Sequence, residues 1–245
     1  MFVRRQAMVI DLNADVAEGV GNEAELVPLV TSINVACAGH AGSPEDIWQT
    51  LQLARKYGVV VGAHPGYFDR EHFGRRELAL TAEELRVELL FQIAGLRALA
   101  EAAGVPVAYL KPHGALYNQA CRDAALAELL VVSVRPYAWP IVALPDSQLE
   151  QSARRYGLRF VREGFADRRY LPDGSLVSRS QPDAFVDDPA EAALQVVRLV
   201  EQKRIETVCV HGDRPGVVEF TRALREELAR RGLEVAPWLT TTPAL

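Results

Sequence analysis

The segment VAYLKPHGALYN, residues 107–118, decides how we interpret the rest of this chain. Its first four residues, 107–110, are apolar or aromatic, which predicts a short strand buried on both faces. The strand is followed at once by the sequence KPHG, residues 111–114. The proline disfavours a helix at this point and keeps the segment extended. Lys111 and His113 are therefore expected at the carboxyl end of a buried strand, where α/β folds bind ligands.

Similar short apolar runs recur along the chain and alternate with longer helical patterns. We predict seven strands, at residues 7–12, 32–36, 59–62, 107–110, 140–144, 159–162 and 207–210. Helix ends are marked by their capping residues: Ser43 opens a helix that stops at Gly58, and Thr81 opens one that stops at Gly104. Strands and helices in alternation require a parallel sheet with right-handed crossovers.

Polar side chains gather just after nearly every predicted strand. In chain order they are Asp11, Asn13, Asp15 and Glu18; His40; His64; Lys111 and His113; Glu163, Asp167 and Arg168; and His211 and Asp213. Four of the five histidines thus lie at strand ends. An open sheet would concentrate ligand-binding residues at one switch point, whereas here almost every strand contributes. The pattern predicts an α/β fold, a distorted (β/α) barrel of about seven parallel strands whose mouth receives these side chains.

Length and composition favour one domain. The 245-residue chain has no linker or low-complexity tract, so we expect a single barrel over residues 1–245, with terminal tails at 1–6 and 237–245. A net charge of −5 with scattered basic residues argues against nucleic-acid binding. Three cysteines without a CxxC pair indicate a reducing compartment, and the N-terminal sequence lacks the apolar run of a signal peptide or membrane span. We expect a cytoplasmic protein, with Cys37 and Cys209 as inert packing residues.

The polar residues of the first strand allow more than one interpretation. Asp11, Asn13 and Asp15 alternate along an extended segment and so share one face, where they could bind a ligand or satisfy a helix cap and loop amides. With His40 and His64, Asp11 could form an Asp/His/His site for a divalent metal that activates water. The same histidines could instead act as general acids and bases.

The later groups also leave alternatives open. Lys111 could neutralise an anionic substrate or a transferred phosphoryl group, or it could pair with Asp or Glu in a structural network. In the polar loop 67–80, Arg75 could contact an anion, and Gly212 would let a ligand approach the backbone between His211 and Asp213. The chain contains no GxSxG elbow, GxxxxGK[ST] phosphate loop or GxGxxG fingerprint.

Taken in order, these motifs resemble those of the LamB/YcsF family. The matching stretches are IDLNAD with EG at 10–19, NVAC with HAG at 34–42, GAHP at 62–65, DRE with FGRR at 69–76, KPHGALYN at 111–118, FADR with Y, DG, LV and R at 165–179 and CVHGD at 209–213. They span essentially the whole predicted domain. The departures are Ala38-Gly39 for the usual Gly-Phe, Ser43 for Asp, DVAEG for DLGEG at 15–19, and Gly66 for Ser. Such changes could alter the substrate or the activity.

The resemblance implies a fold of the glycoside hydrolase/deacetylase barrel type and an ATP-dependent reaction. The family's better-characterised members are A subunits of the prokaryotic 5-oxoprolinase, which open the lactam ring of 5-oxo-L-proline to L-glutamate together with B and C subunits. ATP, with Mg²⁺, would then be the cofactor and a small molecule the substrate. Because no phosphate loop is present, the nucleotide would be held by an unconventional site or by partner subunits. A homo-oligomer is also compatible with the resemblance.

The resemblance also suggests a set of site residues. Those assigned to catalysis are Asp11, Asp15, His40, His64, Lys111 and His113. Those assigned to substrate binding are Asn13, Glu18, Arg75, Asn118, Asp167, Arg168, His211 and Asp213. Asp15 or His40 would serve as the base, while His64 and His113 would orient the substrate or protonate the ring nitrogen. Lys111 would stabilise phosphoryl or carboxylate charge.

Two other functions compete with this one. The first is a metal-dependent amide or N-acetyl hydrolase of the polysaccharide-deacetylase type, which would use Asp11, His40 and His64 as ligands and need no ATP. The second is a non-enzymatic lactam- or sugar-binding protein. A binding protein would not need so many titratable groups in one mouth.

Overall fold

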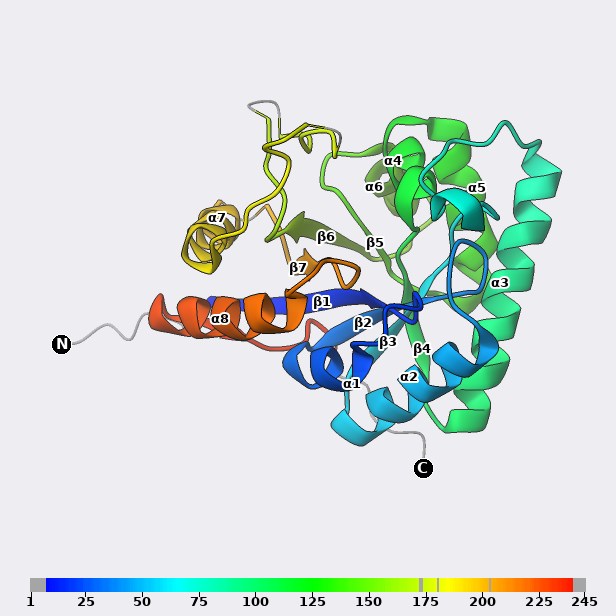
Figure 1. Ribbon diagram of the computed structural model, residues 1–245. Coiled ribbons are helices and arrows are strands. Elements are labelled where there is room, and N and C mark those ends of the chain that lie inside the picture. Colours follow the sequence, from blue (N-terminus) through cyan, green and yellow to red (C-terminus); the bar gives the residue numbers. More distant parts are fainter. Residues whose placement is uncertain (1–7, 172–173, 180, 203, 240–245) are drawn as a thin grey trace.

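The computed structural model describes residues 8–171, 174–179, 181–202 and 204–239 (Figure 1). Its centre is a closed barrel of seven parallel strands, as the sequence predicts. They are β1 (Met8–Val16), β2 (Ser32–Ala36), β3 (Val60–His64), β4 (Val107–Leu110), β5 (Ile141–Ala143), β6 (Phe160–Phe165) and β7 (Thr207–Val210). Each strand pairs with the next, and β1 closes the barrel by pairing with both β2 and β7. The barrel is distorted where β4 meets β5, since only Leu110 and Ile141 are in register.

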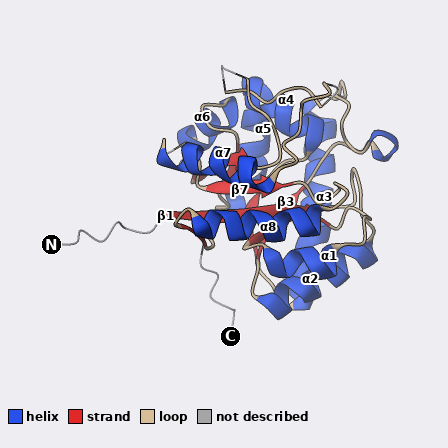
Figure 2. Cartoon of the chain, turned by 60° about the vertical axis from the view of Figure 1, so that its left-hand side comes forward, coloured by secondary structure: helices blue, strands red, loops and turns tan. Residues whose placement is uncertain are grey.

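Helices surround this barrel on the outside (Figure 2). They are α1 (Glu23–Leu26), α2 (Pro44–Tyr57), α3 (Ala82–Ala103), α4 (Gly114–Arg122), α5 (Ala124–Val134), α6 (Gln148–Arg155), α7 (Pro189–Glu201) and α8 (Val217–Arg230). Ser43 and Thr81 form the expected capping boxes of α2 and α3, and Gly58 and Gly104 end these helices in the left-handed conformation. None of the helices in the described ranges is both long and apolar enough to cross a membrane.

The strand boundaries differ from the prediction in an informative way. β1 continues to Val16 and β6 to Phe165, so Asp15 and Glu163 lie within strands rather than after them. Polar residues can continue these strands because they point into a barrel interior that is itself polar. An eighth strand, β8 (Leu233–Val235), was not predicted; it is short and pairs with Met8–Ile10 at the start of β1.

The two faces of each strand serve different purposes. Along β1, Ile10, Leu12 and Ala14 belong to the large apolar core, whereas the residues between them make polar contacts with other strands. At the opposite end of the barrel from the loops that follow the strands, Tyr109 packs with Val60, Val142 and Val161. Trp238 and Leu239, within the segment expected to be a tail, pack against this small cluster, while residues 1–6 lie outside the described residues.

The long loop after β6 folds back over the mouth of the barrel. It makes isolated antiparallel bridges between Arg168 and Phe185 and between Tyr170 and Leu176. The Arg168 guanidinium donates to the carbonyl oxygens of Val177 and Ala184, which ties the two sides of the loop together. The described part of the loop therefore forms one wall above the strand ends, as long loops in compact domains often do.

Candidate active site

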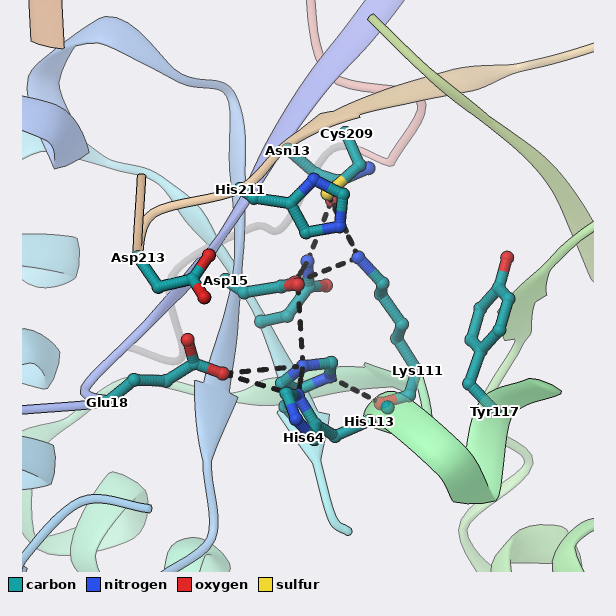
Figure 3. A network of polar contacts seen from close by, with 12 residues as sticks. Asn13, Asp15, Glu18, His64, Lys111, His113, Tyr117, Cys209, His211 and Asp213 are labelled. Atoms are coloured by element: carbon teal, nitrogen blue, oxygen red, sulfur yellow. Dashed lines mark hydrogen bonds and ion pairs between the residues drawn. The ribbon is translucent and has the colours of Figure 1, made fainter. Parts of the chain in front are cut away.

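A cavity of about 410 Å³ opens at the carboxyl ends of the strands. Residues of β1, β3, β6 and α4, and of the loops after β1, β3, β4, β6 and β7, line it. Several of them are drawn in Figure 3. The sequence-predicted residues among its lining are Asp15, Glu18, His64, Arg75, Lys111, His113, Asn118, Arg168, His211 and Asp213. The expectation that strand ends deliver polar groups to one mouth therefore agrees with the position of this cavity.

Lys111 is the centre of a buried ion network beneath the cavity. Its Nζ lies 2.8 Å from Oδ1 of Asp15, 2.9 Å from Oε1 of Glu163 and 3.1 Å from Sγ of Cys209. Burial would lower the pKa of Lys111, but the neighbouring Asp15 and Glu163 hold it well above its usual range. Lys111 is therefore a cation that both belongs to a carboxylate network and lines the cavity, so its two sequence-based interpretations coexist.

The two carboxyl groups beside Lys111 behave differently. Burial would raise the pKa of Asp15, yet the neighbouring His64 and the Lys111 ammonium keep it well below its usual range, so this group is an ionised acceptor. Burial raises the pKa of Glu163, whose other oxygen accepts a hydrogen bond from the hydroxyl of Tyr117 at 2.9 Å. Environment thus separates the two groups, as it does for acid and base pairs in many enzymes.

Asp11 and Asn13 lie deeper in the barrel and do not line the cavity. The Asp11 carboxylate accepts hydrogen bonds from the hydroxyls of Thr31, Ser32 and Thr207. Burial raises its pKa to about 6. This corrects the catalytic and metal-binding roles expected for Asp11, because its oxygens are occupied by three protein hydroxyls.

Asn13 is likewise occupied by protein partners, so its expected role in substrate binding is also corrected. It donates to Glu163 Oε1 at 3.1 Å and to Thr207 Oγ1 at 2.8 Å, and it accepts from Asn34 at 2.7 Å. Its contribution is to hold Glu163 in place beneath the site.

Three histidines and one glutamate form a second cluster, next to Asp15. Oε1 of Glu18 lies 3.1 Å from Nε2 of His40 and 3.3 Å from Nδ1 of His113, and the latter atom is 3.0 Å from Nε2 of His64. The His40 and His113 rings are stacked with centroids 3.6 Å apart, whereas His64 stands perpendicular to both. These four residues, not the expected set of Asp11, His40 and His64, are the group among the described residues whose ligand atoms converge as a metal site requires.

Backbone carbonyls orient two of these imidazole rings. Nδ1 of His64 lies 2.8 Å from the carbonyl oxygen of Lys111, and Nε2 of His113 lies 2.9 Å from that of Phe73. A carbonyl oxygen only accepts, so each of these nitrogens carries the hydrogen. Burial lowers the pKa of His64 to about 3, and burial together with the neighbouring His113 lowers that of His40 to about 4, so the rings of His64 and His40 are neutral at pH 7.

Charged residues form the rim of the cavity. Arg75 makes an ion pair with Asp213, which joins the loop after β3 to the loop after β7. Asn118 lines the cavity from α4, where its side chain donates to the carbonyl oxygen of Gly114 at 3.1 Å. Arg179 completes the rim from the long loop after β6.

Asp167 acts on the cavity indirectly. Its carboxylate lies 2.9 Å from Nδ1 of His211 and accepts a hydrogen bond from the His211 backbone at 3.2 Å. Asp167 does not line the cavity itself, so we replace its expected direct contact with substrate by a role in positioning His211.

Sequence reasoning left several neighbours of the site unassigned. Glu163 was placed after the sixth predicted strand, among the polar residues at the strand ends, but it was given no role in the site. Cys209 was expected to pack inertly, yet its thiol lies next to the Lys111 ammonium. Burial raises the pKa of Cys209 well above its usual range, so it remains a neutral thiol. Tyr117 and Arg179 also line the cavity; both lie within stretches that resemble the family, at 111–118 and 165–179, but neither was assigned a role.

Comparison with known proteins agrees with this architecture. The model of the LamB/YcsF family matches residues 10–242. A protein from Neisseria meningitidis serogroup C, named as the A subunit of 5-oxoprolinase, is 44% identical over 241 residues, which cover 93% of this chain and 98% of that protein. The crystal structure of a lactam utilization protein from Thermus thermophilus is 42% identical and superposes with a TM-score of 0.86, covering 94% of this chain and 99% of that one.

More distant structures share the fold alone. The catalytic domain of a peptidoglycan N-acetylglucosamine deacetylase from Eubacterium rectale superposes with a TM-score of 0.56 at 12% identity, covering 98% of this chain and 93% of that one. This likeness agrees with the expected deacetylase-like barrel. Since the family model spans almost the entire chain and the relatives match it nearly end to end, this protein belongs to the LamB/YcsF family.

Proposed function

We propose that this protein is the A subunit of a 5-oxoprolinase and opens the lactam ring of 5-oxo-L-proline to L-glutamate with ATP. Relatives that carry this name are 43–44% identical to the chain over at least 93% of its length. The observation that carries the proposal is the buried Lys111–Asp15 pair at the floor of a cavity lined by histidines. It combines a fixed cation with an ionised base, which are the groups that opening an amide requires.

The dimensions and charge of the cavity suit a small anion. A volume of about 410 Å³ lies within the range of small-molecule sites. Arg75, Arg168 and Arg179 line it from the loops after β3 and β6, whereas Asp15 and Glu18 line it from the end of β1 and the loop that follows. The carboxylate of 5-oxoproline would bind to the arginine side, and its lactam group would then face Lys111 and the histidines.

The chemistry must overcome the low reactivity of an amide. In the proposed reaction the lactam oxygen attacks the γ-phosphorus of ATP, and ADP leaves. Water then adds to the ring carbon, and the carbon–nitrogen bond breaks to give γ-glutamyl phosphate. A second water hydrolyses this anhydride to glutamate and inorganic phosphate.

Each buried group has a place in this sequence. Asp15 takes the proton from the attacking water and returns it to the departing ring nitrogen. The Lys111 ammonium stabilises the negative charge on the oxygen of the tetrahedral intermediate, in a buried site where such an interaction is strong. His64 and His113 face the same space and orient the water.

The nucleotide and the partner subunits belong to the same proposal. The chain has no phosphate loop, so we propose that Mg²⁺-bound ATP is held at the arginine-lined rim together with B and C subunits. The rim is the open side of the cavity, and a partner seated there would exclude water from the phosphoryl transfer.

Glutamate release from 5-oxoproline and ATP tests the proposal. The purified chain is assayed alone and with B and C subunits that are active with the A chain of another organism. We expect glutamate, ADP and phosphate in equal amounts from the complete complex, and none without ATP. Failure of this chain with competent partners would overturn the assignment.

A second candidate function is ATP-independent hydrolysis of an amide or N-acetyl group. The convergence of Glu18, His40, His64 and His113 favours it, because hydrolases of this kind use metal-activated water. The ATP dependence of turnover separates the two functions. A binding protein without activity would show saturable binding of 5-oxoproline and no turnover with any partner.

A further inference from the structure

Three electron-rich atoms of the histidine cluster converge beside the cavity. We infer that Glu18 Oε1, His64 Nε2 and His113 Nδ1 form a site for one divalent transition-metal ion, with a further position open to the cavity. The inference adds a cofactor to the site described above, and it rests on the proposed function only for the reaction that the ion serves.

The contact between His64 and His113 provides the first argument. Because Nδ1 of His64 and Nε2 of His113 donate to backbone carbonyls, the other nitrogen of each ring bears a lone pair when the imidazole is uncharged. These two unprotonated nitrogens lie only 3.0 Å apart. Two facing lone pairs repel each other unless a cation lies between or beside them.

Glu18 supplies the negative ligand. Its Oε1 lies 3.3 Å from Nδ1 of His113 and 3.9 Å from Nε2 of His64. Ligands about 2.0–2.1 Å from a tetrahedral zinc ion lie about 3.4 Å from one another. The three observed separations, from 3.0 to 3.9 Å, bracket that value.

His40 belongs to the cluster but not to the proposed ligand set. Its ring lies parallel to that of His113 within 3°, with centroids 3.6 Å apart. A metal ion lies near the plane of an imidazole that binds it, and one ion cannot lie in the planes of two parallel stacked rings. His40 also does not line the cavity, whereas the three ligands do. Its Nε2 lies 3.1 Å from Glu18 Oε1, so we assign it the role of orienting the carboxylate.

The donor set selects the class of ion. Two imidazoles and one carboxylate suit zinc and its first-row neighbours, whereas magnesium and calcium prefer oxygen ligands. Three protein ligands with one open position are typical of catalytic zinc sites, where the ion lowers the pKa of a bound water. The Asp15 carboxylate lies beside the proposed site, with its Oδ2 3.6 Å from Nε2 of His64.

Metal binding by the full-length protein tests the inference. Chelator-treated protein is titrated with Zn²⁺ by calorimetry and with Co²⁺ by visible absorption, and bound metal is counted after dialysis. We expect one ion per chain and the intense visible absorption bands of four-coordinate Co²⁺. Glu18→Gln, His64→Ala and His113→Ala should each weaken binding by more than about 100-fold, beyond the 10- to 100-fold loss typical of changes to supporting residues.

Two further variants sharpen the result. His40→Gln keeps a side chain able to donate to Glu18 and should retain the ion with at most about 100-fold weaker binding. His72→Ala removes a half-exposed histidine outside the cluster and should bind zinc as the wild type does. Circular dichroism checks the fold of each variant, and Glu18→Gln, which keeps the shape of the side chain, guards against misfolding of the histidine variants.

The possible outcomes separate this inference from the proposed function. A wild-type chain that retains no stoichiometric metal would overturn the site, even if the reconstituted complex released glutamate. Wild-type affinity in the Glu18, His64 and His113 variants, or an equal loss in His72→Ala, would overturn it too. One bound ion that depends on the three ligands would support it, even if 5-oxoproline proved not to be the substrate.

Discussion

Nζ of Lys111 lies 2.8 Å from Oδ1 of Asp15, and both side chains are more than nine-tenths buried. The pair links the residue after β4 to β1 across the inside of the barrel. Oε1 of Glu163, on β6, lies 2.9 Å from the same Nζ. A buried cation shared by two carboxylates is stable only as a set, because removing one member leaves uncompensated charge in a poorly solvated space. The site and the stability of the barrel therefore depend on the same interaction.

Replacing Lys111 with methionine should affect both properties. The substitution leaves Asp15 and Glu163 facing each other without a cation. We expect the free energy of unfolding to fall by about 3–5 kcal/mol and glutamate formation to fall by about 100- to 1,000-fold. Chemical denaturation and the reconstituted ring-opening assay measure the two effects.

A double variant separates charge imbalance from loss of packing. Lys111→Met combined with Asp15→Asn removes one negative charge together with the positive one, so it should recover part of the lost stability without recovering activity. Lys56→Met, at an exposed position on α2, is the matched control and should match the wild type in both measurements. Equal stability of Lys111→Met and the wild type would show that the network does not stabilise the barrel.

A methyl group at Gly66 should disturb the histidine cluster. A Cβ at this position would lie 2.7 Å from Nδ1 of His40 and 3.2 Å from Cβ of His113, which is too close without a shift of these side chains. Displacements of about 1 Å can cost about 100-fold in rate. We therefore expect Gly66→Ala to reduce kcat by at least about 10-fold and to weaken zinc binding.

Gly95 offers a matched control for this substitution. It lies on the exposed side of α3, and a Cβ there would meet no atom within 4 Å. Gly95→Ala should raise the free energy of unfolding by up to about 1 kcal/mol, because alanine favours the helix, and should leave kcat unchanged. Full activity in Gly66→Ala would mean that the cluster tolerates the displacement and that His40 has no part in positioning Glu18.

The arginine rim should control substrate affinity more than turnover. Arg179 lines the outer cavity, where burial and the nearby charge of Arg75 lower its pKa. Arg179→Gln removes a charge from the binding side and leaves Lys111 intact, so KM for 5-oxoproline or ATP should rise by about 10-fold with kcat changed less. Arg86→Gln, at an exposed position on α3, is the control and should leave both KM values unchanged. An unchanged KM for both substrates would exclude Arg179 from binding either anion.

The sequence predicted most of the barrel because its signals are local. Apolar runs identify strands buried on both faces, and capping residues such as Ser43 and Thr81 identify where helices begin. Lys111 and His113 could be placed at a strand end because the proline between them stops helix formation. Closure of the barrel could also be predicted from the sequence, because polar residues follow six of the seven strands and a closed barrel brings them to one mouth.

The features that the sequence did not predict depend on how deep a side chain lies in the barrel and on contacts between residues far apart in the chain. Alternation along β1 predicts that Asp11 and Asp15 share a face, but not that Asp11 lies deeper, among three hydroxyl groups. The end of a strand was placed too early wherever polar residues point into the barrel, which left Glu163 without a role. Glu18 joins the histidines only through the loop after β1, and no spacing rule in the sequence encodes that approach.

The stability of the barrel should depend on pH through Asp11, in a direction opposite to that of a paired carboxylate. Burial raises its pKa from 3.8 to about 6, so the folded protein holds this proton more tightly than the unfolded chain does. Its contribution to the free energy of unfolding is therefore complete below pH 3.8 and declines as the pH rises to about 6, by about 3 kcal/mol in total. Asp11→Asn cannot ionise. Its stability relative to the wild type should therefore increase across that range, as measured by denaturation at pH 4, 5, 6 and 7.

Asp167 provides the internal contrast for this prediction. Burial would raise its pKa, but the charge and hydrogen bonds of His211 lower it, so its contribution is present above pH 3.8 and is lost as the pH falls through the lowered folded-state pKa. Asp167→Asn should therefore be less stable than the wild type at pH 7, and the gap should close on acidification. If Asp11→Asn instead follows the pattern of Asp167→Asn, the Asp11 carboxylate is stabilised in its ionised form, and the three hydroxyls outweigh burial.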